Sequence, residues 1–336
     1  MTGSGIAIDW LLEPDSENPG VRYFALRDLL GLGPEDAEIR QAQAAVMATG
    51  PVPRILAAQH PDGYWATPGA GYGPKYQGTA WQIVFLGELG ADGADARVAA
   101  GCRYLLEHTQ TATGGFGCSA ALRTPPPPSS VIHCLNGNLL WALIGLGWLE
   151  DPRIGRAIEW QARSIAGSDP DVRYYRSGTS GPGFACGVNQ GQPCGWGAAK
   201  AIRALLAVPP HLRDAETQRA LELGAEFFLS RNPAQADYPY SGSVSGTWFR
   251  FGFLHSYWSD VLEVTEILVD LGYGNDPRLA DAFDLILSKR DAAGRWRLEN
   301  SLNGKTWAPI EAKGKPSKWI TLRALRTLRK AGRAAE

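Results

Sequence analysis

The pattern of hydrophobic and polar positions divides most of the chain into two alternating kinds of helical segment. One kind is rich in small and apolar residues on every side, which is typical of a buried helix. The other has one apolar stripe and one polar face, which is typical of a helix that covers a core. The first kind, which we call inner segments, comprises residues 21–32, 78–89, 134–146, 194–206, 257–271 and 317–328. An amphipathic outer segment follows each of them except the last.

The junctions between these segments share a short motif. A Leu-Gly pair ends one helix, and an Asp, often followed by Pro and Arg, begins the next. Gly tolerates the left-handed conformation that ends many helices, and Asp accepts hydrogen bonds from the free N–H groups at a helix start. The copies are Leu89-Gly90 with Asp95, Leu146-Gly147 with Asp151, Leu271-Gly272 with Asp276, and looser versions at residues 32–36 and 208–214.

Six helical hairpins of this kind predict an all-α fold in a single domain over residues 1–336, with roughly the first 15 and the last 6 residues peripheral. Two arrangements fit the repeat: a closed α/α toroid with inner and outer helix rings, and an open α-solenoid. An open solenoid needs polar capping repeats at its ends. The last inner segment instead carries Arg323, Arg326 and Arg329, which can pair with the N-terminal region. We therefore expect the closed α/α toroid.

A turn of defined sequence accompanies the repeat. Residues 59–65 read Gln-His-Pro-Asp-Gly-Tyr-Trp, and weaker copies occur at residues 110–116 and 291–296. The turn resembles the QW motif of the prenyltransferase and squalene-oxidase repeat, which occurs in squalene–hopene and oxidosqualene cyclases and in protein prenyltransferase β subunits. The resemblance extends over roughly residues 20–330. In this motif the Gln side chain and the aromatic ring tie helix ends together, so the resemblance is specific for the fold and weak for the function.

The motifs that carry the chemistry of these families are absent. The chain has neither the Asp-x-Asp-Asp acid of class II terpenoid cyclases nor the Asp-rich magnesium motifs of class I terpene synthases. Residues 193–199 and 254–258 resemble the cysteine- and histidine-bearing zinc stretches of protein prenyltransferase β subunits, but no matching Asp is evident upstream of Cys194. The lanthionine cyclases, toroids with Cys, Cys and His around zinc, are similar in this respect, although their Cys-His-Gly motif is missing.

Two neighbouring repeats each carry one Cys in a loop and one at the start of the next inner segment. The four residues are Cys118, Cys134, Cys186 and Cys194. Equivalent positions of adjacent repeats lie close together in a toroid, and a helix N-terminus favours the thiolate that binds metal. Four thiolates predict a structural zinc site, and three with an open position predict a catalytic one. Packing as small apolar side chains and a lone reactive thiol are the alternatives.

Asp260 is the candidate general acid, because a carboxylate on an apolar helix is costly unless it is paired or used. His255 and Tyr257 stand close to it in the sequence and complete the catalytic prediction. The alternative for Asp260 is a structural one, in which the N-terminal turn of the helix satisfies the carboxylate.

Aromatic residues are frequent, with 12 Trp, 11 Tyr and 10 Phe. Trp81, Trp196 and Trp258 fall near the starts of inner segments, where we expect them to line the cavity and bind substrate, since aromatic rings stabilise cations. Arg250 and Lys318 are predicted to meet an anionic head group. Core packing of the rings and solvated surface charges are the alternatives.

A long loop at residues 232–254 is too aromatic for disorder and is predicted to form a lid or cavity rim. Its aromatic residues include Tyr238, Tyr240, Trp248 and Phe253.

Composition excludes several classes of partner. The net charge of −1 comes with no basic stripe for nucleic acid and no polybasic run for a membrane surface. No apolar run reaches membrane-spanning length, no signal peptide is visible, and the 5 Cys do not suit a disulfide framework. We therefore expect a reduced, cytoplasmic protein without a membrane span, for which peripheral membrane contact stays open. The sequence predicts neither the substrate nor the oligomeric state.

Three functions follow from these patterns. The first is a terpenoid cyclase- or prenyltransferase-like protein that processes or binds a small apolar or isoprenoid substrate in the central cavity, as the resemblance implies. The second is a zinc–thiolate enzyme on the same fold. The third is a non-catalytic lipid-binding or scaffold protein, which the missing acid motifs favour.

Overall fold

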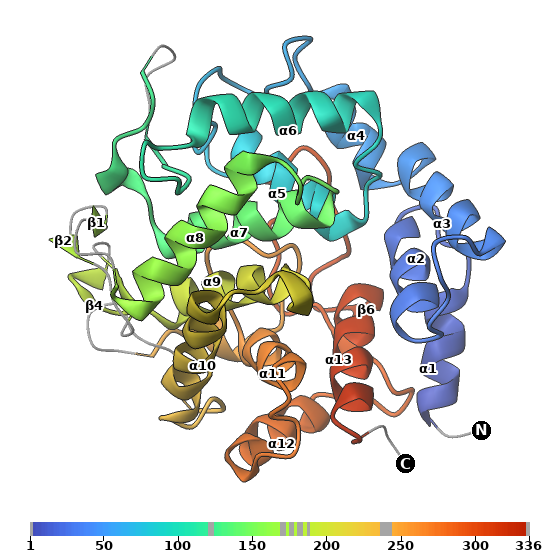
Figure 1. The fold of residues 1–336 in the computed structure, drawn as a ribbon. Coiled ribbons are helices and arrows are strands. Elements are labelled where there is room, and N and C mark those ends of the chain that lie inside the picture. The colour runs from blue at the N-terminus through green and yellow to red at the C-terminus, as the bar shows by residue number, and fades with distance from the viewer. Residues whose placement is uncertain are drawn as a thin grey trace.

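The computed structural model describes residues 3–119, 124–168, 173–174, 178–179, 184–186, 189–235 and 244–333. Within these ranges the protein is mostly helical, in agreement with the expected all-α class (Figure 1). The α-helices are α1 (Gly3–Leu12), α2 (Pro19–Asp28), α3 (Ala37–Ala48), α4 (Pro51–Ala57), α5 (Thr79–Leu89), α6 (Ala96–Thr109), α7 (His133–Gly145), α8 (Pro152–Ala166), α9 (Gly195–Ala207), α10 (Ala215–Leu229), α11 (Val261–Asp270), α12 (Ala280–Ser288) and α13 (Lys318–Lys330).

Three small antiparallel sheets and short 3-10 helices lie in the connecting loops of the described residues. The strand pairs are β1 (Arg173–Tyr174) with β2 (Gly178–Thr179), β3 (Ala185–Cys186) with β4 (Gln192–Pro193), and β5 (Trp296–Arg297) with β6 (Pro316–Ser317). The 3-10 helices are Pro128–Ser130, Pro210–Leu212, Gly246–Phe249 and Pro277–Leu279.

The inner segments form α2, α5, α7, α9, α11 and α13, which we call the inner helices. The ends of α5, α7 and α9 lie within one residue of the predicted ends. Helix α2 ends at Asp28 rather than at residue 32, because Gly31 takes a left-handed φ of 72°. Helix α11 begins at Val261 rather than at residue 257, because Asp260 caps it there.

The junction motif forms the predicted caps. The capping side chains accept backbone N–H groups two residues ahead at 2.9 Å, in the pairs Asp95 with Arg97, Asp151 with Arg153, and Asp276 with Arg278. The preceding glycines have left-handed φ values of 80° at Gly90, 87° at Gly147 and 93° at Gly272. The caps at the three full copies of the motif are therefore confirmed, whereas the looser copy at residues 32–36 does not end α2, which stops at Asp28.

The Gln-to-Trp turn ties helix ends together, as predicted. The Gln59 Nε2 atom donates to the carbonyls of Gly63 at 3.1 Å and of Arg97, in the first turn of α6, at 2.9 Å. The Trp65 ring is fully buried, and its Nε1 donates to the Ile55 carbonyl at 2.7 Å. The copy at residues 110–116 repeats the two Gln bonds, and the copy at residues 291–296 repeats the Trp bond.

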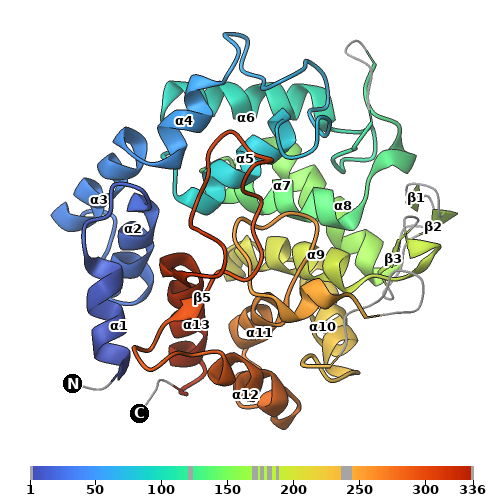
Figure 2. The same cartoon turned by 180° about the vertical axis from the view of Figure 1, so that it is seen from behind.

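Successive inner helices pack side by side. Helix α5 packs against α7, α7 against α9, α9 against α11, α11 against α13, and α13 against α2 (Figures 1 and 2). Helix α2 approaches the end of α5 closely at Gly20. A side chain there would not fit, because its Cβ would lie 2.3 Å from the Leu89 carbonyl oxygen.

Two further segments cover this core. Helix α1, which the pattern does not predict, buries Ala7 and Leu11 and packs on α2 and α13. The loop between β5 and β6 runs beside α5 (Figure 2), where the Trp307 Nε1 donates to the Gln77 carbonyl at 2.9 Å. No helix in the described ranges is both long enough and apolar enough to cross a bilayer.

Candidate functional site

The main cavity has a volume of about 710 Å³ and is lined by side chains from all six inner helices. On α2, α5, α7 and α9 the lining residues lie in the C-terminal half of the helix. The lining is therefore drawn from one end of these helices, opposite to the helix starts that carry Cys134 and Cys194. One lining residue from each helix, in the order α2, α5, α7, α9, α11 and α13, is Phe24, Glu88, Trp141, Arg203, Glu263 and Arg323.

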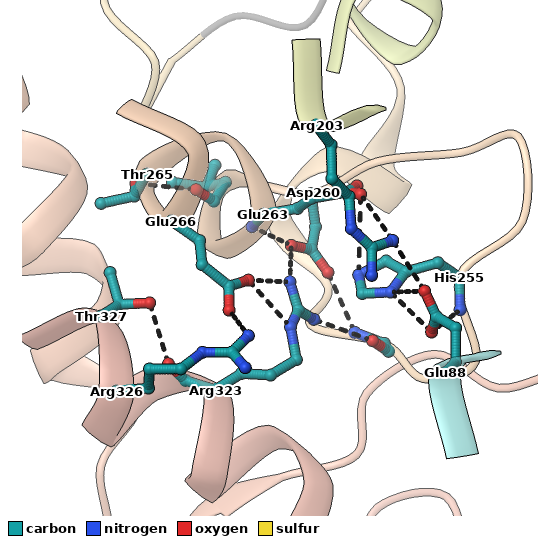
Figure 3. Close-up of polar contacts among 12 residues, drawn as sticks. Glu88, Arg203, His255, Asp260, Glu263, Thr265, Glu266, Arg323, Arg326 and Thr327 are labelled. Carbon is teal, nitrogen blue, oxygen red and sulfur yellow. Dashed lines mark hydrogen bonds and ion pairs between the residues drawn. The ribbon is translucent and has the colours of Figure 1, made fainter. Parts of the chain in front are cut away.

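His255 and Glu88 form a buried pair in this cavity (Figure 3). The His255 Nδ1 atom lies 2.8 and 2.9 Å from the two Glu88 carboxylate oxygens, and the His255 backbone N–H donates to Glu88 at 3.1 Å. Because an ionised carboxylate only accepts hydrogen bonds, we assign the ring proton to Nδ1. The other ring nitrogen, Nε2, is buried, has no hydrogen-bond partner among the residues that the structure describes, and lies 3.9 Å from Glu263 Oε1.

Arg203 and Lys200 of α9 surround the two glutamates. Arg203 donates to Glu88 at 2.7 Å, and its guanidinium lies 3.6 Å from the centroid of the Trp141 ring, which is cation–π geometry. Lys200 Nζ lies 2.6 Å from both Glu263 carboxylate oxygens, and both side chains are almost completely buried. Lys200 is thus the close partner of Glu263, and Arg203 binds Glu88 closely while lying 3.8 Å from Glu263.

A second part of the charge network joins α11, α13 and α2. Arg323 binds Glu266 at 3.1 Å, and Arg326 bonds to Glu266 (Figure 3). Arg326 also binds Asp28 of α2 at 2.8 Å. Arg329 donates to the Leu29 carbonyl. These arginines are the ones that the sequence predicts to pair with the N-terminal region, and two of them do so.

The charges and the burial set the protonation states. Burial alone raises the pKa of the Glu88 carboxyl, but His255 and Arg203 outweigh it and hold that pKa well below its usual range. The Glu263 pKa falls to about 2, because Lys200 and the other nearby cations outweigh its burial. Burial lowers the pKa of His255, which Glu88 and Glu263 offset only in part. At neutral pH the site therefore holds a neutral imidazole between two ionised carboxylates.

The structure gives Asp260 the structural role that the sequence left as the alternative. Asp260 is the N-cap of α11 and accepts the backbone N–H groups of Glu263 at 2.8 Å and Gly252 at 3.0 Å. Burial raises its pKa, while Arg323 at 3.9 Å lowers it. It does not line the main cavity, whereas His255 does. Tyr257, the third predicted catalytic residue, lies outside the cavity in a ring cluster with Tyr76 and Trp196.

None of the five predicted substrate-binding residues lines the main cavity. Trp81 is buried and donates to the Tyr72 carbonyl at 2.8 Å. Lys318 Nζ lies 3.3 Å from Asp15, in the N-terminal region. The remaining three are Trp196, which is half-buried, Trp258, which is buried against Gly252, and Arg250, which is exposed. Their role in substrate binding stays a prediction.

The predicted aromatic loop contributes one wall. Phe253 lines the cavity and stacks on Trp319, with ring centroids 4.2 Å apart. Trp248 is fully buried. Tyr238 and Tyr240, also part of this prediction, lie outside the described residues.

The four predicted metal ligands lie near one another at the starts of α7 and α9. A hydrogen bond with Cys186 and burial raise the pKa of Cys194 well above its usual value. Burial raises the pKa of Cys134 to about 12, and Cys186 and Cys118 add to this effect. Burial therefore outweighs the expected helix effect at Cys134 and Cys194, and these two thiols are protonated. Among the described residues, no three His, Cys, Asp or Glu side chains are placed so that they could hold a metal ion.

Sequence reasoning missed most of the charged residues of the cavity, although a signal was present. Glu88, Lys200, Arg203, Glu263 and Glu266 all interrupt apolar inner segments. A charge on a helix that is buried all round must be paired or functional. The argument that singles out Asp260 in the sequence therefore extends to these five residues.

Comparisons with known proteins do not identify the site. No protein-family model matches the chain, and no curated protein matches it. A crystal structure of a protein from Actinoplanes aligns with 98% of this chain and 98% of its own, at 14% sequence identity and a TM-score of 0.44. A likeness at this level carries no argument about fold or function.

Proposed function

We propose that the six inner helices close an α/α toroid and that the main cavity is its central binding site. The support is the continuous series of helix contacts, which the Arg326–Asp28 ion pair of 2.8 Å completes between α13 and α2. All six helices contribute to one cavity, as a closed ring requires. Ligand cavities of several hundred Å³ are typical of small-molecule sites.

We infer that the cavity is catalytic and that His255 is a general base. The observation that carries this proposal is the unpartnered, buried Nε2 atom of His255 in the cavity. Its partner Nδ1 is fixed by Glu88, so the Nε2 lone pair is free to accept a proton. A buried polar atom without a partner is costly unless a ligand satisfies it.

The neighbours of His255 suit proton abstraction. When Nε2 takes a proton from the substrate, Glu88 and Glu263 lie within 4 Å of the imidazolium and stabilise its charge. Arg203 also lines the cavity and offers positive charge to an anion that develops on the substrate. The reaction class is therefore proton removal from a bound small molecule.

The lining favours a substrate with both apolar and polar parts. Phe24, Trp141, Phe253 and Trp319 provide aromatic surface, and the charged residues lie beside them. Such a substrate is compatible with the isoprenoid or similar apolar molecule that the QW resemblance implies, provided that it carries a polar group with a removable proton. Because the proposed step removes a proton, it does not supply the initiating acid of the class II cyclases.

Incubation of the protein with prenyl diphosphates and with squalene tests this function. We expect turnover by the native protein, and a loss of about 100-fold or more in His255→Gln, since a general base contributes 10²–10⁴-fold. His60→Gln is the matched control, because His60 is exposed and lies outside the cavity. Full turnover by His255→Gln would refute the assignment of the base. Binding without turnover by the native protein would support the lipid-binding alternative instead.

A zinc–thiolate enzyme remains the second candidate. The hydrogen bond between Cys186 and Cys194, with Cys134 nearby, supports it, although the thiols as placed do not form a metal site. All five cysteines are free thiols, which persist in a reducing compartment. We therefore also propose a cytoplasmic location.

A further inference from the structure

Cys186 and Cys194 are joined by a hydrogen bond between their thiols at the start of α9. Cys186 lies in β3, and Cys194 follows β4 and forms the N-cap of α9. Across the hairpin, the Cys194 N–H donates to the Phe184 carbonyl at 3.1 Å. In the same hairpin, Asn189 Nδ2 donates to the Pro193 carbonyl at 2.7 Å. The backbone therefore holds the two sulfur atoms within hydrogen-bonding distance of each other.

The two thiols differ in exposure and in the direction of their hydrogen bond. Cys186 is half-buried, whereas Cys194 is buried. The shared hydrogen bond raises the pKa of Cys194, so Cys194 keeps its proton and donates to the Cys186 sulfur. A sulfur that accepts a hydrogen bond is favoured as the thiolate, and the thiolate is the form that attacks a disulfide. Cys186 is therefore the nucleophile of the pair, and Cys194 is the thiol that follows.

A third thiol lies close to this pair. Cys134, in the first turn of α7, is near enough to interact electrostatically with both Cys186 and Cys194. Cys134 is therefore the competing partner for either sulfur. An experiment on this pair has to identify which two sulfurs react, in addition to counting the thiols that are lost.

We propose that Cys186 and Cys194 form a reversible disulfide by exchange with a small-molecule disulfide, independently of the chemistry in the main cavity. The Cys186 thiolate attacks one sulfur of the small disulfide, whose S–S bond breaks, and a mixed disulfide forms while the first small thiolate leaves. Cys194 then loses its proton to water and attacks the Cys186 sulfur, which releases the second small thiolate. Both small thiolates take up protons. The cysteine pair thus loses two electrons and two protons, and the small disulfide gains them as two thiols.

The position of the pair gives the disulfide a structural consequence. The bond ties the hairpin of β3 and β4 covalently to the N-cap of α9, where the Cys194 sulfur accepts the Gly197 N–H at 3.4 Å in the reduced protein. Helix α9 also carries Lys200 and Arg203, which bind the two buried glutamates of the main cavity. Disulfides in a reducing compartment are typically transient and redox-sensing, which agrees with an exchange that small thiols reverse.

The experiment incubates the reduced, full-length protein with an excess of oxidised glutathione, in the presence of EDTA so that no metal protects the thiols. Acid stops the exchange, alkylation marks the remaining thiols, intact mass counts them, and peptide mapping locates the new bond. We expect the native protein to lose two of its five thiols to a Cys186–Cys194 bond, and dithiothreitol to restore both. Cys118→Ser is the matched control, because Cys118 is a half-buried loop thiol outside the pair, and it should also lose two thiols.

Two variants test the assigned roles, and circular dichroism confirms that each is folded. Cys194→Ser keeps a favoured N-cap residue on α9 and should stop at the mixed disulfide, with one glutathione on Cys186. Cys186→Ser should react with glutathione about tenfold or more slowly and form no internal disulfide, because the more exposed thiol of the pair is gone. The inference is overturned if the native protein keeps all its thiols, if the lost thiols map to another pair such as Cys134 with Cys194, or if Cys194→Ser does not take up glutathione at Cys186.

Discussion

The buried ion pair of Lys200 and Glu263 provides a test of whether the charges in the cavity serve stability or function. Its side chains are 0% and 2% exposed, and the Nζ atom contacts both carboxylate oxygens at 2.6 Å. The change Lys200→Met keeps the size of the side chain and removes its charge. Glu263 then keeps Arg203 at 3.8 Å as a cationic neighbour, while the neutral His255 ring lies 3.9 Å away.

Removing one partner of a buried pair costs about 3–5 kcal/mol, because the other charge is left uncompensated. We expect about 3 kcal/mol for Lys200→Met, the lower end, since Arg203 still compensates part of the Glu263 charge. In the double variant Lys200→Met/Glu263→Leu no charge is left uncompensated. Exchange of a whole buried pair for apolar residues is neutral or stabilising by about 1–4 kcal/mol. The double variant should therefore recover the stability that the single variant loses.

Urea denaturation of the native protein and both variants measures the free energies of unfolding, and turnover is assayed in parallel. Arg40→Met is the control, because Arg40 and Glu35 form an exposed pair worth about 0–1 kcal/mol. We expect the double variant to be stable and inactive, since Glu263 lies beside His255. A loss below about 1 kcal/mol in Lys200→Met would refute the reasoning about burial, and a fully active double variant would refute the catalytic role of this network.

Three further predictions concern titration and metal. Burial lowers the pKa of His133 from 6.5 to about 3, so below pH 6.5 the unfolded chain binds a proton that the folded protein does not. The free energy of unfolding should therefore fall by about 1.4 kcal/mol per pH unit as the pH drops from 6.5 toward 3, and His133→Gln should remove that part of the slope in denaturation series. Because burial also lowers the pKa of His255, the pH profile of kcat/KM should fall on acidification with an apparent pKa below 6.5; one above 6.5 would contradict the neutral base. If the four thiols bind zinc, purified protein should contain about one zinc per chain and Cys194→Ser should lose it; less than about 0.1 per chain in the native protein, unchanged in the variant, would remove the zinc hypothesis.

The helical hairpins could be predicted from the sequence because their signals are local. A cap is made by residues two or three positions apart, as Asp95 with Arg97, and a helix end by a single left-handed residue such as Gly90. The inner helices could be recognised because they are apolar on all sides. Helix α1 was not predicted, since its burial depends on α2 and α13, which lie far away in the sequence.

The site was less accessible to sequence reasoning because it depends on distant pairs. Glu88 and His255 are 167 residues apart, and no pattern within one repeat connects them. In the sequence His255 stands close to Asp260, which suggests that these two residues act together. In the structure the hydrogen-bond partner of His255 is Glu88. The sequence also does not show at which end of the inner helices the cavity lies. Trp81 and Trp196, which are predicted to bind the substrate, lie toward the helix starts and do not line the main cavity.

The two ends of the inner helices therefore differ in what they can do. At the starts of α7 and α9, burial raises the pKa values of Cys134 and Cys194 and works against the reactive thiolate form. In the main cavity, burial acts together with paired charges and leaves the His255 imidazole neutral with a free lone pair. A core made only of apolar residues would be at least as stable as one that buries Glu88, Lys200, Arg203 and Glu263. A role in binding and proton transfer, as we propose for the main cavity, gives a reason for burying these charges.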